Sequence, residues 1–248
     1  MQYRSAAVGG IVTQFVFGFI RVMIFTAFYA NANIHTGMNL SQVISYIWLG
    51  QAFLMMLPFS GDNDVNQLVR TGSVACELLR PIDLYSMWFA RSLAARTAPT
   101  LLRCLPILIT GLLFLGLKLP ATISAAILFA VSMCLTLLLN SAYNTMMVVI
   151  TVRTLSSDGP IRMSTAFVYL LCGIAIPSSL FPDALQPLLH LLPFRGMMDT
   201  PFVIYTGAVS GMAVAVLLLH QVVWTGLLVL IGRWLLMSVQ RHLVVQGG

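Results

Sequence analysis

Charge is scarce in this sequence. Only 8% of its 248 residues are charged, 59% are hydrophobic, and the mean hydropathy is +0.93. A soluble domain has about 25% charged residues and about 45–50% apolar residues. The composition therefore indicates an integral membrane protein. Because lipid-exposed backbone must satisfy its hydrogen bonds within its own element, and because no strands of alternating polarity are seen, the spanning elements are expected to be α-helices.

Acidic residues are fewer still, and none falls inside a predicted span. A transporter that runs on protons or sodium usually carries ionisable groups within its spans, because these groups bind and release the coupling ion. An ion-coupled pump is therefore disfavoured. The seven acids map to predicted loops or interfacial segments: Asp62, Asp64, Glu77, Asp83, Asp158, Asp183 and Asp199.

Motifs for catalysis and metal binding are also missing. The only lysine, Lys118 in "GLKLP", has neither the glycine spacing before it nor the Ser or Thr after it that a phosphate-binding loop requires. The four cysteines include no CxxC pair, and the histidines form no zinc-protease motif. We therefore predict no enzyme active site, no metal site and no cofactor in this chain.

Six segments are long and apolar enough for a membrane span, which needs about 20 residues. Most arginines fall near one side of the membrane if the N-terminus is cytoplasmic, so both termini are predicted to be cytoplasmic. The net charge of +6 then reflects topology, and no nucleic-acid partner is predicted. The prediction is one all-α transmembrane domain over residues 1–248 with spans at 8–30, 40–59, 90–117, 121–145 with a helical extension to Val152, 163–180 and 211–236.

Four polar residues within these spans are candidates for a pathway or an interface. Arg21 lies near the middle of the first span, where a charge costs about 2.5–3.5 kcal/mol, and Gln14 lies on much the same helical face. Arg21 could line a substrate path or an inter-subunit contact, or it could snorkel to the membrane surface. Asn140 and Asn144 share one face of the fourth span. They could bond between helices or line a central pathway.

Between the second and third spans the chain turns polar, in residues 61–89. Apolar residues recur there at helical spacing among charges, and Pro81 is predicted to lie in the first turn of the next helix. The segment could lie in the headgroup layer with its arginines on anionic lipid, or it could form a docking surface for a cytosolic partner.

Three motifs together resemble the ABC-2 family of transporter permeases. The first is a glycine followed by "ELLRPID" after the second span. The second is the proline-rich run "LCGIAIPSSLFPDALQPLLHLLPFRGMMDTPFVIYTG" after the fifth span, and the third is the last helix, "HQVVWTGLLVLIGRWLLMSVQRHLVVQGG". The similarity extends over nearly the whole chain. It is strongest to the bacterial branch in which two different permeases accompany one ATPase.

The resemblance implies a six-helix, type V exporter-like permease in the bacterial plasma (inner) membrane. It implies a cytoplasmic coupling helix in the 61–89 region and external re-entrant helices at 181–206. The implied coupling residues are Arg70, Gly72, Glu77, Leu79, Arg80, Pro81 and Asp83. The implied markers of the external region are Pro177, Phe181, Pro182, Pro193, Phe194 and Pro201. The implied partners are a cytosolic ABC ATPase dimer, which would bind ATP and magnesium, a second, non-identical permease, and membrane lipids.

The expected function is that of the permease subunit of an ATP-driven exporter. It would move an amphipathic or lipophilic substrate out of the cytoplasm by alternating access. Drugs, lipophilic cations, peptides and lipids all fit so apolar a chain. The alternatives are a non-transporting membrane scaffold or assembly protein, and an ABC import permease. The resemblance carries over no substrate-binding residue.

Overall fold

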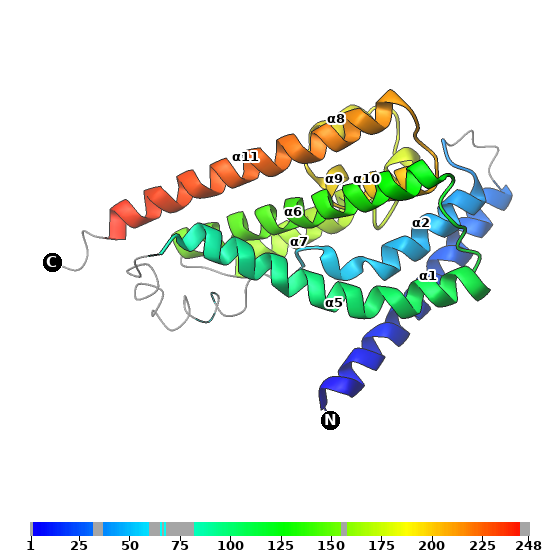
Figure 1. Ribbon diagram of the computed structural model, residues 1–248, viewed down its shortest axis with the longest axis horizontal. Helices are drawn as coiled ribbons and strands as arrows, with labels where there is room; N and C mark the ends of the chain where they lie inside the picture. Colours follow the sequence, from blue (N-terminus) through cyan, green and yellow to red (C-terminus); the bar gives the residue numbers. More distant parts are fainter. Residues whose placement is uncertain are drawn as a thin grey trace.

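Four long helices form the body of the protein (Figure 1). The computed structural model describes residues 2–31, 37–59, 65, 67, 82–154 and 158–243. Each of the long helices contains a stretch long and apolar enough to cross a membrane. They are α1 (Gln2–Asn31), α5 (Leu84–Phe114), α6 (Ile123–Thr154) and α11 (Met212–Leu243).

The outward faces of these helices carry large, exposed apolar side chains. Phe17 on α1, Leu102 on α5, Ile127 on α6 and Leu230 on α11 are all exposed. Apolar surface on this scale is rare on soluble monomers and is typical of a surface that faces lipid. The structure thus confirms an all-α, multi-pass membrane protein.

The two remaining predicted spans contain shorter helices. The segment 40–59 holds α2 (Leu40–Ala52) and the 3₁₀ turn η1 (Leu54–Met56). The segment 163–180 holds most of α7 (Asp158–Leu171) and the 3₁₀ turn η2 (Ser178–Leu180). Six membrane crossings therefore stay a prediction, while four helices meet the length and composition of a span.

Glycine explains why the chain leaves the helical path after α7. Gly173 has φ +88°, in the left-handed region that other residues avoid. A Cβ at this position would also collide with the side chains of Tyr46 and Asp199. The break after α7 is therefore set by both conformation and packing.

Helix α6 lies at the centre of the bundle and packs against α5, α11 and α10 (Asp199–Tyr205). The run from Leu139 to Thr145 is buried on every side, polar residues included. A helix that contacts protein all round must satisfy its polar groups against its neighbours. The contacts of Asn140 and Asn144 follow from this position.

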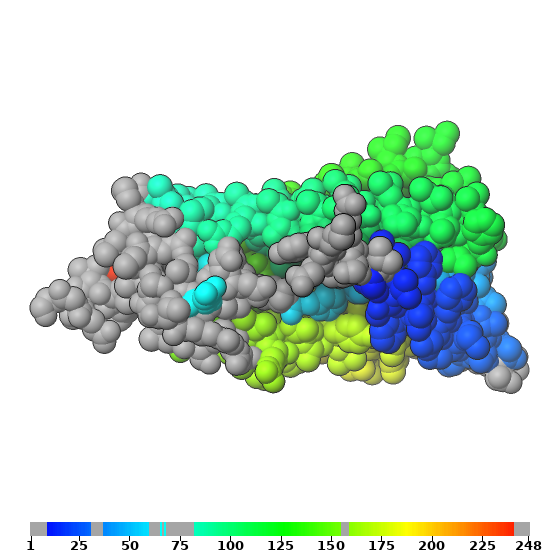
Figure 2. All heavy atoms as spheres, turned by 90° about the horizontal axis from the view of Figure 1, so that it is seen from below, coloured from blue at the N-terminus to red at the C-terminus, as the bar shows by residue number. Residues whose placement is uncertain are grey.

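Helix α1 packs on α2 by close approach at a glycine. A Cβ at Gly18 would overlap the ring of Trp48, so only glycine allows the two helices to come this near. Phe15 and Phe19 flank the same ring with centroid distances of 6.0 and 5.4 Å. Figure 2 shows α1 in blue, with α5 on one side of it and the yellow-green of α7 on the other.

A series of short helices joins α7 to α11, in the region predicted to form external re-entrant helices. Prolines begin or precede three of them: Pro177 stands at the N-cap of η2, Pro187 in the first turn of α8 (Gln186–Leu191), and Pro193 at the N-cap of α9 (Phe194–Met197). Proline is favoured there because the first turn needs no donor from it. The whole of α10 is buried.

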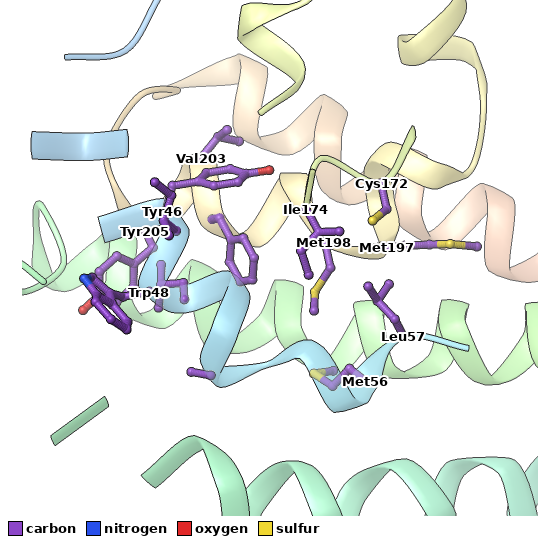
Figure 3. Packing of buried hydrophobic residues seen from close by; sticks show 14 of the residues in the cluster. Tyr46, Trp48, Met56, Leu57, Cys172, Ile174, Met197, Met198, Val203 and Tyr205 are labelled. Carbon is purple, nitrogen blue, oxygen red and sulfur yellow. The ribbon is translucent and has the colours of Figure 1, made fainter. Parts of the chain in front are cut away.

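The main core lies where these short helices meet α2, α6 and α7. Figure 3 shows Ile174, Met197 and Met198 with Cys172 and Leu57, drawn together from segments far apart in sequence. A second, smaller core lies at the end of the bundle where α5 begins and α6 and α11 end. It is formed by Val65, Leu84, Tyr85, Trp88, Val148, Val149, Val152, Leu236 and Val239.

Candidate functional site

Arg21 on α1 reaches the break that follows α7. One nitrogen of its guanidinium donates to the carbonyl oxygen of Ile174 and the other to the hydroxyl oxygen of Tyr169, both at 2.6 Å. Its Cζ also lies 5.8 Å from the centre of the Tyr169 ring, within cation–π range. The charge predicted near the middle of the first span therefore faces protein.

Arg21 and Gln14 line the same cleft, as their shared helical face predicts. The cleft has a volume of about 560 Å³ and lies between α1, the end of α2 with its following turn, and α7. The surface of its lining is mostly apolar, and Arg162 is a second cation in that lining. The lining residues are Thr13, Gln14, Phe17, Arg21, Gln51, Leu54, Phe59, Arg162, Thr165, Ala166 and Tyr169.

Gln14 is an unusual member of this lining. Its side chain is 4% exposed, and neither its Oε1 nor its Nε2 has a hydrogen-bond partner among the described residues. A buried polar group without a partner costs about 1–3 kcal/mol. Such groups are rare in native structures and call for an explanation.

Asp199 forms the most completely bonded acidic site of the described chain. Its side chain is fully buried, and it accepts hydrogen bonds from the Tyr46 hydroxyl at 2.8 Å, from the Ser178 amide at 3.1 Å and from Nε of Arg195 at 3.1 Å. The Ser178 hydroxyl donates a further hydrogen bond to it. These bonds join α2, η2 and α9 to the first residue of α10, so this carboxylate holds the short helices on the bundle.

Asn140 and Asn144 bond to two different neighbours. Nδ2 of Asn140 donates to the carbonyl oxygen of Met197 at 3.2 Å, and Nδ2 of Asn144 donates to Oγ of Ser92 at 3.2 Å. The first bond joins α6 to α9, and the second joins α6 to α5. Neither residue lines the cleft beside Arg21.

Gln221 on α11 completes the polar contacts around α9. Its Nε2 donates to the carbonyl oxygen of Gly196 at 2.8 Å and its Oε1 accepts from Ser132 at 3.0 Å. Thr136 on α6 donates to the same carbonyl oxygen at 3.1 Å. The end of α9 is thus held from both sides by buried side chains of the long helices.

Asp83 is the one predicted coupling residue inside the described ranges, since Arg70, Gly72, Glu77, Leu79, Arg80 and Pro81 lie outside them. It caps α5, accepting from the Ser86 amide at 3.3 Å and from the Ser86 hydroxyl at 2.6 Å. Helix α5 therefore begins at Leu84, later than the start predicted at Pro81. Arg233 on α11 also donates to the Asp83 carboxylate at 3.2 Å.

Hydrogen bonding holds the Asp83 carboxyl in its charged form. The bond from the Ser86 hydroxyl is the main reason that its pKa lies below the ordinary value of 3.8. The amide of Ser86 and the charge of Arg233 lower this pKa further. The end of the predicted coupling region is thereby tied to the last long helix.

The comparisons with known proteins place the chain in a family. A family model described as "ABC-2 family transporter protein" matches residues 15–247. The chain belongs to the ABC-2 transporter family. No curated protein and no solved structure gives a significant match. The match supports an ABC-2 type permease, and membership implies in general that an ATPase partner supplies the energy.

Sequence reasoning missed two buried charges of this ABC-2 protein. Arg96 on α5 is not among the polar candidates that the sequence singled out, but it is 7% exposed and donates to the backbone carbonyl and the hydroxyl of Ser92 at 3.0 and 2.7 Å. Ser92, Arg96 and Thr100 recur every fourth residue, and that spacing could have revealed a polar face turned to protein. Asp199 was assigned to an external loop region, and nothing in its neighbouring residues signals its burial.

Proposed function

We propose that this chain is the permease subunit of an ATP-driven exporter in the bacterial plasma membrane. It pairs with a second, non-identical permease and works with a cytosolic ATPase dimer that binds ATP and magnesium. The observation that carries the proposal is the family match over residues 15–247. The absence of a phosphate-binding loop from the printed sequence agrees with it, because such a chain must receive its free energy from a partner.

The cargo is proposed to be amphipathic or lipophilic and to move outward by alternating access. ATP-driven closure of the ATPases would rock the two permeases about their shared interface. The region 61–89 would receive this motion, and both termini would lie in the cytoplasm. The short helices from Ser178 to Tyr205 would cap the pathway on the far side.

The test is to purify the tagged protein from its native membrane in mild detergent and to identify its stoichiometric partners. A P-loop ATPase together with a second six-span protein supports the heteromeric exporter. The ATPase alone points to a homodimer, which contradicts the second permease. If neither is recovered, the exporter is contradicted and the scaffold becomes the better proposal.

A second test addresses the coupling region directly. Glu77→Lys and Arg80→Glu should each lower ATP hydrolysis by the complex while membrane insertion stays intact. Arg153→Gln, an exposed arginine at the end of α6, serves as the control. Unchanged hydrolysis in both charge reversals would contradict the coupling role of this segment.

A further inference from the structure

The cleft beside Arg21 has the size of a small-molecule site. Its volume of about 560 Å³ falls within the range of about 300–1,000 Å³ that is usual for ligand pockets. Phe17, Leu54, Phe59 and the ring of Tyr169 supply an apolar wall. A ligand that fills it would therefore need a substantial apolar body.

The charges of the cleft have one sign. Arg21 and Arg162 both line it, and no acidic residue is among the described residues of its lining. No described carboxylate pairs with either guanidinium. Arg21 uses two N–H groups on Ile174 and Tyr169, and a guanidinium carries five, so it retains donors for a ligand. Two cations in a largely apolar cleft attract an anion and repel a lipophilic cation.

Gln14 is a further polar group in the same lining. It is buried, and both of its amide atoms lack partners among the described residues. With its side chain turned into the cleft, the Nε2 of Gln14 would gain a partner in a ligand head group with acceptor oxygens, which would offset part of the cost of its burial.

We propose that this cleft binds an amphipathic anion, with a carboxylate or phosphate head group among Arg21, Arg162 and Gln14 and an apolar chain against Phe17, Leu54 and Phe59. The anion comes either from the exporter's cargo or from an acidic lipid of the bilayer. The cargo assignment rests on the proposed function, whereas the binding chemistry does not. The inference narrows the substrate class, because it disfavours lipophilic cations.

The test is photolabelling of the full chain in phosphatidylcholine nanodiscs. The probes are a diazirine-bearing hexadecanoic acid and a diazirine-bearing hexadecylamine with the same chain, and the labelled peptides are mapped by mass spectrometry. The acid should label the segments 13–21 and 162–169 about tenfold more than the amine, a ratio that corresponds to about 1.4 kcal/mol. Equal labelling of these segments by the two probes would overturn the proposal.

Two variants report on the head-group site without cutting the bonds that Arg21 makes to Ile174 and Tyr169. Arg162→Gln and Gln14→Leu should each lower the acid labelling by about tenfold or more, since each removes a hydrogen bond to a charged head group and tenfold corresponds to about 1.4 kcal/mol. Arg153→Gln removes the same charge from the exposed end of α6 and should leave the labelling unchanged. Folding is checked by the melting temperature, which Gln14→Leu should raise. Labelling that resists both variants would contradict the assigned head-group position.

The source of the anion is decided in the native complex, reconstituted in vesicles with its ATPase. If ATP lowers the acid labelling of the cleft, the anion is cargo. If the labelling is insensitive to ATP and an acidic phospholipid is extracted with the purified protein, the anion is a resident lipid and the cargo assignment is overturned. If no ATPase is found, the exporter is contradicted, but the nanodisc result is unaffected. Failure of the proposed function can therefore be distinguished from failure of the binding proposal.

Discussion

Arg233 on α11 donates to the Asp83 carboxylate at 3.2 Å, although 150 positions of sequence separate the two residues. The same nitrogen donates to Oγ of Ser86 at 3.0 Å, and the guanidinium lies 5.4 Å from the centre of the Tyr85 ring. The start of α5 and the last long helix are therefore joined by one arginine. This junction lies at the end of the region proposed to receive the motion of the ATPase.

The first prediction is that this ion pair stabilises the fold only slightly. Its side chains are 49% and 55% exposed, and exposed pairs contribute about 0.2–1 kcal/mol. A double-mutant cycle of Asp83→Asn and Arg233→Gln, followed by denaturant unfolding in detergent, should give a coupling energy in this range that decreases with added salt. A coupling energy well above it, or one that salt does not change, would contradict the prediction.

The second prediction concerns the pH dependence of the same carboxyl. Because the pKa of Asp83 in the folded protein lies below 3.8, its stabilising effect is present above the pKa of the unfolded chain and is lost as the pH falls through the folded value. The melting temperature of the wild type should therefore exceed that of Asp83→Asn at pH 6. The difference should shrink below about pH 4. A difference in melting temperature that stays constant from pH 6 to pH 3 would show that the charge of Asp83 does not contribute to stability.

The third prediction is that Asp199 is required for the fold of the short helices. Asp199→Asn would leave the nearly buried Arg195 without its charge partner, and breaking a buried pair typically costs about 3–5 kcal/mol. Asp183→Asn is the matched control, since Asp183 is exposed in the same segment and its carboxylate accepts a hydrogen bond from Gln186. Scanning fluorimetry should show a large fall in melting temperature for the first variant and little change for the second. Similar shifts in both would refute the role of Asp199.

The fourth prediction compares two glycines in long helices. Gly18→Ala places a methyl group against the ring of Trp48 and should destabilise the packing of α1 on α2 by about 1–3 kcal/mol. Gly226→Ala on α11 meets no atom within 4 Å and should be neutral or stabilising by up to about 1 kcal/mol, because alanine favours the helix. Both are measured by unfolding in the same detergent. Equal effects would mean that the contact at Gly18 is not tight.

Hydropathy was sufficient to locate the long helices, because each must supply an apolar surface over most of its length. The predicted segment 211–236 begins one residue before α11 and otherwise lies within it, and the helical extension predicted to Val152 is part of α6. Hydropathy also predicted spans at 40–59 and 163–180, which contain shorter helices. The break after α7 depends on Gly173, which has a positive φ and where a Cβ would collide with Tyr46 and Asp199.

The candidate site was predictable only in part. Periodicity placed Gln14 and Arg21 on one face of a helix, and both line the cleft. The partners of Arg21 could not be read from the sequence, because Ile174 and Tyr169 lie about 150 positions away and are brought near by the packing of α1 and α7. Arg162 became part of the same cleft for the same reason.

Composition and periodicity thus determined by themselves that this chain is an all-α membrane protein, and three motifs pointed to its family. These properties depend on local sums of hydrophobicity and on short stretches of sequence. The tertiary structure alone decided that Asp199 is buried and that Arg233 meets Asp83. Each of these depends on the burial and contacts of a charged side chain, and those are set by residues distant in sequence that only the folded packing brings together.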